Sequence, residues 1–84
     1  MITVRVRYFA GARAAAGVAE EDVALAVPAT VDHALTAVGD RHGEPLRRVL
    51  TASSYLLNAI AVRDRSTLVG DGDALDVLPP FAGG

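Results

Sequence analysis

The sequence predicts an α+β fold, with one mixed β-sheet and one main helix packed against a face of it. Three observations support this. Two runs near the N-terminus alternate apolar and polar residues, a central run repeats apolar residues at helical spacing, and β-rich runs return after it. At 84 residues the chain is the size of a single domain. A helix covering a sheet lets both elements bury their apolar sides.

Residues 2–9 and 20–27 are the first two predicted strands. Apolar residues recur at every second position of the first, which is typical of a half-buried strand. The second alternates in the same way and ends at Pro28, which cannot donate a ladder hydrogen bond. The alanine-rich segment 10–17 is expected to form a short helical turn or loop, so that the two strands pair as a hairpin.

The main helix is predicted to start after Thr30, which fits as an N-cap, with Asp32 near the positive end of the helix dipole. One apolar stripe at spacings i, i+3, i+4 and i+7 consists of Val31, Ala34, Leu35 and Val38. Gly43 and Pro45 indicate the end of this helix. A further helical turn is expected from Leu46, Val49 and Leu50.

The second half of the chain returns to strands. Residues 55–63 form a β-rich run, 68–69 a short buried segment, 70–73 a tight turn and 74–78 the last strand. The crossover after the second strand favours a ubiquitin-like β-grasp, in which the last strand lies centrally beside the first. We therefore expect a β-grasp domain over residues 1–78 and a flexible C-terminal Gly-Gly tail over 79–84.

Composition excludes several classes of protein. The net charge is −2 and the arginines form no pronounced cluster, so nucleic acid is not an expected partner. Without cysteine there is no disulfide, thiolate nucleophile or cysteine-based metal site, and the chain also lacks lysine. No apolar run approaches the roughly 20 residues that span a bilayer, so we expect a cytoplasmic protein that does not bind membranes.

The polar residues give no sign of an active site within this chain. His33 and His42 lie on or near the helix without a cysteine or serine partner, which favours a capping or solvated role. Asp71, Asp73 and Asp76 break the spacing of a calcium loop, so a turn is the better interpretation and no metal site is predicted.

The C-terminal segment, Pro79 to Gly84, is the most informative part of the chain. Its two prolines prevent the last strand from continuing, and two terminal glycines could pass through a slot too narrow for other residues. Six extended residues reach about 20 Å. An ionised carboxylate resists nucleophiles, but an acyl-adenylate has a good leaving group, and sulfide or a persulfide could convert it into a thiocarboxylate. A chain end without function is the alternative, since termini are commonly disordered.

This ending resembles that of the MoaD/ThiS sulfur-carrier family, and most closely the small (MoaD) subunit of molybdopterin synthase. The resemblance extends over nearly the whole chain, and its specific part is residues 71–84, where a DGD turn, an apolar strand, two prolines, one apolar residue, a small residue and two glycines follow in order. Weaker similarities occur in the family's order at Tyr8-Phe9-Ala10 with Arg13, at Thr30-Val31-Asp32 with Leu35, and at Asn58 with Val62.

The resemblance implies a non-catalytic, sulfur-donating subunit of a two-subunit synthase. An E1-like (MoeB-like) adenylating enzyme would use ATP to activate Gly84, which would then carry the sulfur as a thiocarboxylate. The tail would enter the active site of the large (MoaE-like) subunit, where the sulfur would become part of the molybdopterin dithiolene. Gly83 would be the slim residue of the channel, and Phe81 and Pro80 would contact the partner. The chain itself would bind no cofactor.

Three other interpretations stay open. Related carriers serve cysteine biosynthesis and thiamin-thiazole biosynthesis, although the paired prolines Pro79 and Pro80 favour the molybdopterin branch. A ubiquitin-like interaction module without sulfur chemistry is the third.

Overall fold

The computed structural model describes residues 1–80; residues 81–84 lie outside the described part. Within that range, no helix is both long enough and apolar enough to cross a bilayer. The elements follow one another in the order β1 (Ile2–Tyr8), α1 (Ala10–Ala16), β2 (Glu20–Leu25), β3 (Ala29–Thr30), α2 (Val31–His42), α3 (Glu44–Thr51), β4 (Ser54–Leu57), β5 (Ile60–Ala61), β6 (Leu68–Val69) and β7 (Ala74–Leu78).

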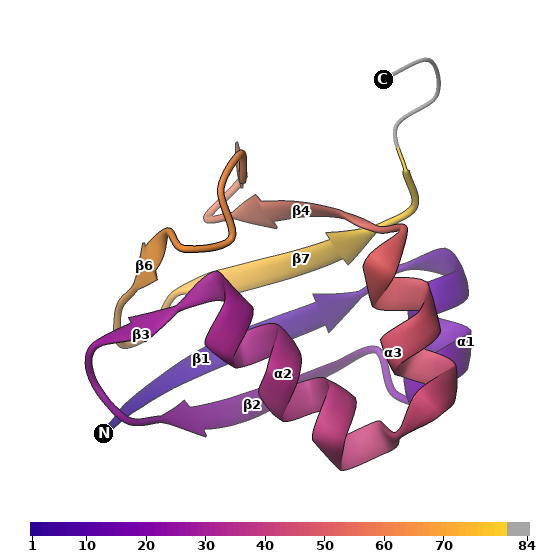
Figure 1. Ribbon diagram of the computed structural model, residues 1–84, viewed down its shortest axis with the longest axis horizontal. Helices are drawn as coiled ribbons and strands as arrows, with labels where there is room; N and C mark the ends of the chain where they lie inside the picture. The colour runs from indigo at the N-terminus through magenta and orange to yellow at the C-terminus, as the bar shows by residue number, and fades with distance from the viewer. Residues whose placement is uncertain (81–84) are drawn as a thin grey trace.

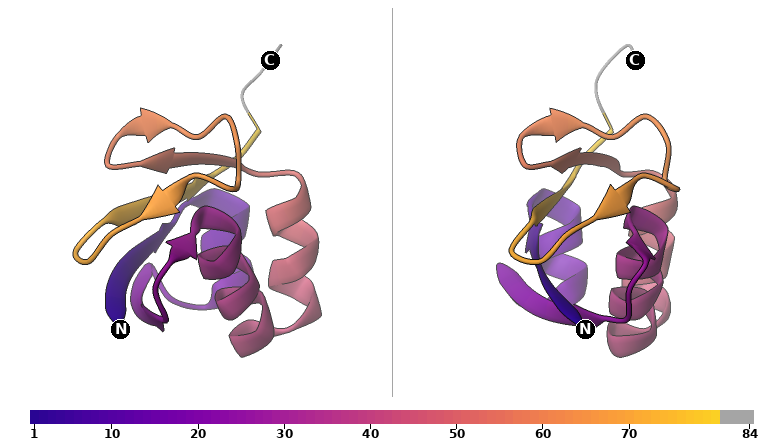
Figure 2. Two further views of the ribbon diagram at one scale, coloured as in Figure 1. Left: turned by 60° about the vertical axis from the view of Figure 1, so that its left-hand side comes forward. Right: turned by 90° about the vertical axis from the view of Figure 1, so that its left-hand side faces the viewer.

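The main sheet has the strand order β2-β1-β7-β4-β5. β7 pairs in parallel with β1 and antiparallel with β4, so the sheet is mixed and its last strand is central. The short strands β3 and β6 form a separate antiparallel pair. Helices α2 and α3 cover one face of the sheet (Figures 1 and 2). This topology confirms the predicted ubiquitin-like β-grasp, with α1 and α3 added to the main helix.

The core lies between the sheet and α2. Alternate residues of β1 and β7 point into it, and the stripe predicted on α2 faces them, all at 2% exposure or less; these residues are Val4, Val6, Tyr8, Val31, Ala34, Leu35, Val38, Leu75 and Val77. Burying one such large apolar side chain contributes about 1.5–3 kcal/mol. The core therefore fixes β7 to the body of the protein from one side.

The main helix begins and ends where the sequence predicts, and the structure differs from the prediction only after it. α2 begins with a capping box, in which the Thr30 hydroxyl accepts from the His33 N–H and the His33 ring accepts from the Thr30 N–H. It ends at Gly43, whose φ of 88° turns the chain away from the helix axis, so the expected further turn is a separate helix, α3. Helix α3 packs closely against α2 at Gly39. A Cβ added at this position would lie 3.1 Å from Cγ of Arg47.

Three of the predicted strand segments also differ from the strands of the structure. β2 stops at Leu25, and Val27, expected to be the last inward residue of that strand, is exposed. The β-rich run 55–63 is a hairpin of β4 and β5, because Asn58 and Ala59 have φ values of 50° and 69° and reverse the chain. Of the segment 68–69 only Val69 is buried; Leu68 is 65% exposed.

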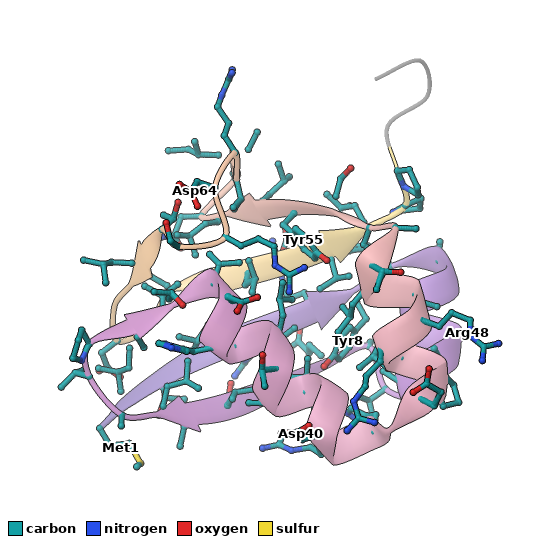
Figure 3. The ribbon with its side chains drawn as sticks, in the orientation of Figure 1. Met1, Tyr8, Asp40, Arg48, Tyr55 and Asp64 are labelled. Atoms are coloured by element: carbon teal, nitrogen blue, oxygen red, sulfur yellow. The ribbon has the colours of Figure 1, made fainter. Side chains whose placement is uncertain are left out.

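A polar cluster joins α2 to the first hairpin. The carboxylate of Glu21 accepts hydrogen bonds from the Tyr8 hydroxyl and the His42 ring, and from Arg41 at 2.8 Å. Tyr8 (labelled in Figure 3) is buried, and its ring also packs in a T-shaped arrangement with the ring of His42. Burial disfavours the charged carboxylate, but these three donors outweigh it and hold the pKa of Glu21 below its ordinary value.

The start of β7 is held by the β4–β5 turn. Asn58 donates to the Asp73 carboxylate at 3.0 Å and accepts from the Ala74 N–H at 2.9 Å, and its own N–H donates to the Ala74 carbonyl. On the β1 side, the Arg5 N–H donates to the Asp73 carbonyl. The central strand is therefore clamped from both neighbours at its first residue.

Glu21→Gln should lower the free energy of unfolding by about 1–3 kcal/mol at neutral pH, because three donors lose a charged acceptor. The folded-state pKa of Glu21 is lowered, so this contribution is fully present above the unfolded value of about 4.3 and is lost as the pH falls through the folded value. Urea unfolding at several pH values should show the two proteins converging in acid. Asp40→Asn, at an exposed carboxylate paired with Arg47, is the control. A difference that persists at low pH would contradict the assignment.

Asn58→Ala should lower the free energy of unfolding by about 2–3 kcal/mol, because two hydrogen bonds are lost and alanine tolerates a positive φ poorly. Asn58→Gly loses the same bonds but accepts the backbone conformation, so its loss should be smaller. Chemical denaturation measures both, with Arg63→Ala in the same hairpin as the control. Wild-type stability in both Asn58 variants would show that this side chain does not hold β7.

Candidate functional site

The candidate site is the end of β7, where the chain leaves the sheet (Figure 1). Leu78, the last residue of the strand, pairs with Ser54 of β4, and the Val77 carbonyl accepts a hydrogen bond from the Phe9 N–H at 3.1 Å. Ladders on both sides thus extend to the last residues of the strand. Pro79 and Pro80 follow directly and are exposed. Whatever the tail carries is tethered to a fixed point.

Only one of the predicted site residues lies in the described part of the chain. Pro80 is exposed beyond the end of β7, where a partner that handles the tail could reach it. Phe81, Gly83 and Gly84 lie outside the described residues, so their roles, and the flexible tail expected over 79–84, stay predictions.

A hollow of about 160 Å³ lies beside this exit point. Small and apolar residues of α1, α3 and the end of β7 line it, with Ser53 as a polar member; the others are Gly11, Ala12, Val49, Ala52, Leu78, Pro79 and Pro80. On the helix side of the exit point, a partner that holds the tail would therefore contact an uncharged surface.

The opposite side of the exit point belongs to the sheet face that no helix covers. Phe9 has an extended backbone (φ −129°, ψ 149°), so the alternation of β1 continues by one residue and places its ring on the face that carries Arg7. Phe9 is 40% exposed. We did not predict a site role for Phe9. The sequence pattern could have indicated it, because Phe9 continues the alternate positions of Arg5 and Arg7, where an outward-facing residue is usually polar.

An ion pair lies in the middle of this uncovered face. The Nε and Nη2 groups of Arg7 donate to the two carboxylate oxygens of Asp76 at 2.5 and 2.8 Å, in a bidentate arrangement. Asp76 is only 6% exposed, although it points away from the core. The hydrogen bonds that Arg7 donates to Asp76, together with the negative charge of that carboxylate, raise the pKa of Arg7 above its ordinary value.

The other carboxylates and histidines considered in the sequence have structural partners. Asp71 accepts from the Thr3 N–H and Asp73 from the Gly70 N–H, as the turn interpretation expected. His33 caps α2, which confirms a capping role, and His42 binds Glu21. Within residues 1–80 no three metal-ligating side chains gather into a group that could hold a metal ion. The structure brings none of these residues to the exit point.

Comparison with known proteins identifies the family. The ThiS family model matches residues 6–84. A search of the curated proteins finds no match.

Among solved structures, a protein from Pyrococcus furiosus provisionally named molybdopterin converting factor subunit 1 is 28% identical, with a TM-score of 0.86 over 96% of this chain and 100% of that one. Small archaeal modifier protein 1 of Haloferax volcanii is 26% identical, with a TM-score of 0.83 over the same shares.

A complex of subunits 1 and 2 of the molybdopterin-converting factor from Helicobacter pylori contains a chain that is 24% identical. Its TM-score is 0.71, over 99% of this chain and 100% of that one, and at this identity the likeness concerns the fold. The family predicted from the C-terminal segment is thus confirmed, and the chain belongs to the ThiS family of ubiquitin-like sulfur carriers.

Proposed function

We propose that the carboxyl group of Gly84 is the carrier site, and that the protein is the small, sulfur-donating subunit of a molybdopterin synthase. The observation that carries the proposal is the placement of the Gly-Gly end directly behind β7, a central strand that is hydrogen-bonded on both sides up to its last residues. A carrier of this kind needs a reactive end that reaches into another protein and a rigid strand to which that end is attached.

The chemistry needs two steps on the terminal carboxylate. An E1-like enzyme joins the carboxylate to the α-phosphate of ATP, which forms an acyl-adenylate and releases pyrophosphate. A sulfide nucleophile then attacks the carbonyl carbon, and AMP leaves with the bonding electrons, so that a thiocarboxylate remains. The chain has no cysteine, so no internal thiol competes for the activated acyl group.

Two partners follow from this proposal. The adenylating enzyme and the large synthase subunit must each admit the tail, with Gly83 in the narrowest part of the channel and Phe81 and Pro80 against the entrance. In Helicobacter pylori, the protein of this fold was solved together with subunit 2 of the same factor. The paired prolines and the likeness to the Pyrococcus furiosus protein support the molybdopterin branch.

A second candidate function is protein modification, because small archaeal modifier protein 1 is about as similar to this chain as the molybdopterin relative. The carriers for cysteine and thiamin-thiazole biosynthesis also remain alternatives, as does an interaction module without sulfur chemistry. Since the chain has no lysine, a modifier of this sequence could attach to itself only through the amino group of Met1.

Incubation with its adenylating enzyme, ATP and sulfide should replace one oxygen of Gly84 by sulfur. Intact-mass and C-terminal peptide analysis would detect the change. A variant without Gly83 and Gly84 should unfold like the wild type and carry no sulfur, whereas Arg48→Ala, on the outer side of α3 (Figure 3), should be sulfurated normally. An unmodified wild-type terminus under these conditions would contradict sulfur carriage.

The recipient decides between the branches. The thiocarboxylated protein, mixed with a large synthase subunit and cyclic pyranopterin monophosphate, should lose its sulfur as the dithiolene forms. A cysteine-synthase-like enzyme with its activated serine substrate is the matched control and should leave the sulfur in place. Transfer to the second recipient and none to the first would assign the protein to the cysteine branch.

A further inference from the structure

The length of the tail limits where an activating enzyme can sit. The four residues beyond Pro80 reach at most about 14 Å when fully extended. An enzyme that holds the Gly84 carboxyl in its active site must therefore bring its own surface close to the end of β7. The residues around the exit point therefore lie within reach of its surface.

The uncovered sheet face carries an exposed aromatic side chain there, because Phe9 is 40% exposed. Phe9 and Leu78 lie on this face by the alternation of β1 and β7, and Leu56 is the register partner of Asp76 on β4. Phe9 and Leu78 follow the Arg7–Asp76 pair along their strands, and Leu56 lies beside it on β4. Glu20 of β2 lies on the other side of the pair, opposite Arg7. The pair lies two residues before the end of β7, about 7 Å along the strand.

The pair presents hydrogen-bond donors outward. Both oxygens of Asp76 are occupied by Arg7, and the carboxylate is nearly buried. The Nη1 group of Arg7 makes no hydrogen bond with any residue from 1 to 80, and the Arg7 side chain is 44% exposed. Covering it with a purely apolar surface would leave two donors without partners, at a cost comparable to a lost buried hydrogen bond.

We propose that Arg7, held by Asp76, is a specificity-determining residue for docking of the adenylating enzyme, which places a neutral hydrogen-bond acceptor against its Nη1 group. The acceptor is a backbone carbonyl or a side-chain amide oxygen. A carboxylate fits less well, because Asp76 already balances the charge of Arg7 and Glu20 lies close enough to act on it. This inference rests on the proposed function, since it requires an activating partner.

The test compares two double variants of similar chemistry on the same face. Arg7→Leu with Asp76→Ala removes the inner pair and leaves neither partner alone, so the fold should persist. Arg5→Leu with Asp22→Ala removes the outer pair, which is exposed and lies two residues farther from the exit point. It also breaks the exposed ion pair between Arg5 and Glu20. Thermal unfolding establishes that both are folded, and ATP–pyrophosphate exchange with the adenylating enzyme gives KM and kcat for each.

Loss of the inner pair should raise KM about tenfold or more with little change in kcat, because the acceptor on the enzyme loses its donor. Loss of the outer pair should change KM less than about threefold. The ratio of KM values between the inner variant and the wild type should be the same at low and high salt, since a neutral acceptor is not screened.

Other outcomes would overturn the inference. An unchanged or lower KM for the inner variant would mean that apolar contact alone drives docking, and equal effects of the two variants would mean that the whole face acts through its charge. A KM ratio that shrinks steeply with salt would identify a charged group on the enzyme. If the wild type itself supports no exchange, the proposed function fails and the inference fails with it; exchange with equal KM values rejects the inference alone.

Discussion

The structure depends on one constraint, which is that the C-terminal segment follows β7, a central strand paired on both sides. β7 has a ladder on each side, a core contact beneath Leu75 and Val77, and a clamp at its start from Asn58 and the Arg5 N–H. Opening this strand would break two ladders and uncover the core. A group attached behind Leu78 is therefore positioned by the whole fold, and only the few residues after the strand have to adapt to a partner.

The same arrangement explains why a small domain keeps charges on its uncovered face. β7 is central, so its outward residue Asp76 is crowded by both neighbouring strands, and burying a carboxylate there is costly unless a partner lies at hydrogen-bond distance. Arg7 provides it from the parallel neighbour. An apolar pair at these positions would be no less stable, but it would join Phe9, Leu56 and Leu78 in a continuous apolar patch next to the tail. The ion pair interrupts that patch and places the exposed Arg7 guanidinium on this face.

Local patterns in the sequence predicted those features that depend on residues close together in the chain. The cap at Thr30 and the apolar stripe of α2 depend on neighbours within one or two helical turns, so spacing alone was sufficient.

Long-range partners could not be predicted in this way. Glu21 falls near the start of the predicted strand 20–27, but the donors to its carboxylate come from β1 and α2. The contact of Arg7 with Asp76 spans 69 positions and depends on the register of β1 and β7. The hypothesis of a carrier role was based on the C-terminal residues, whose types and order could be compared with those of a known family without knowledge of the fold.

Trapping the activated terminus with hydroxylamine tests the central claim most directly. With the adenylating enzyme and ATP but no sulfide, an acyl-adenylate at the end of the chain should react with hydroxylamine and lose AMP. The product would be a hydroxamate whose position mass spectrometry can assign. The account predicts a hydroxamate at Gly84 alone, formed only when ATP is present. Hydroxamate on an internal carboxylate such as Asp71 or Asp73, or none at Gly84 while the enzyme consumes ATP in the presence of this protein, would contradict it.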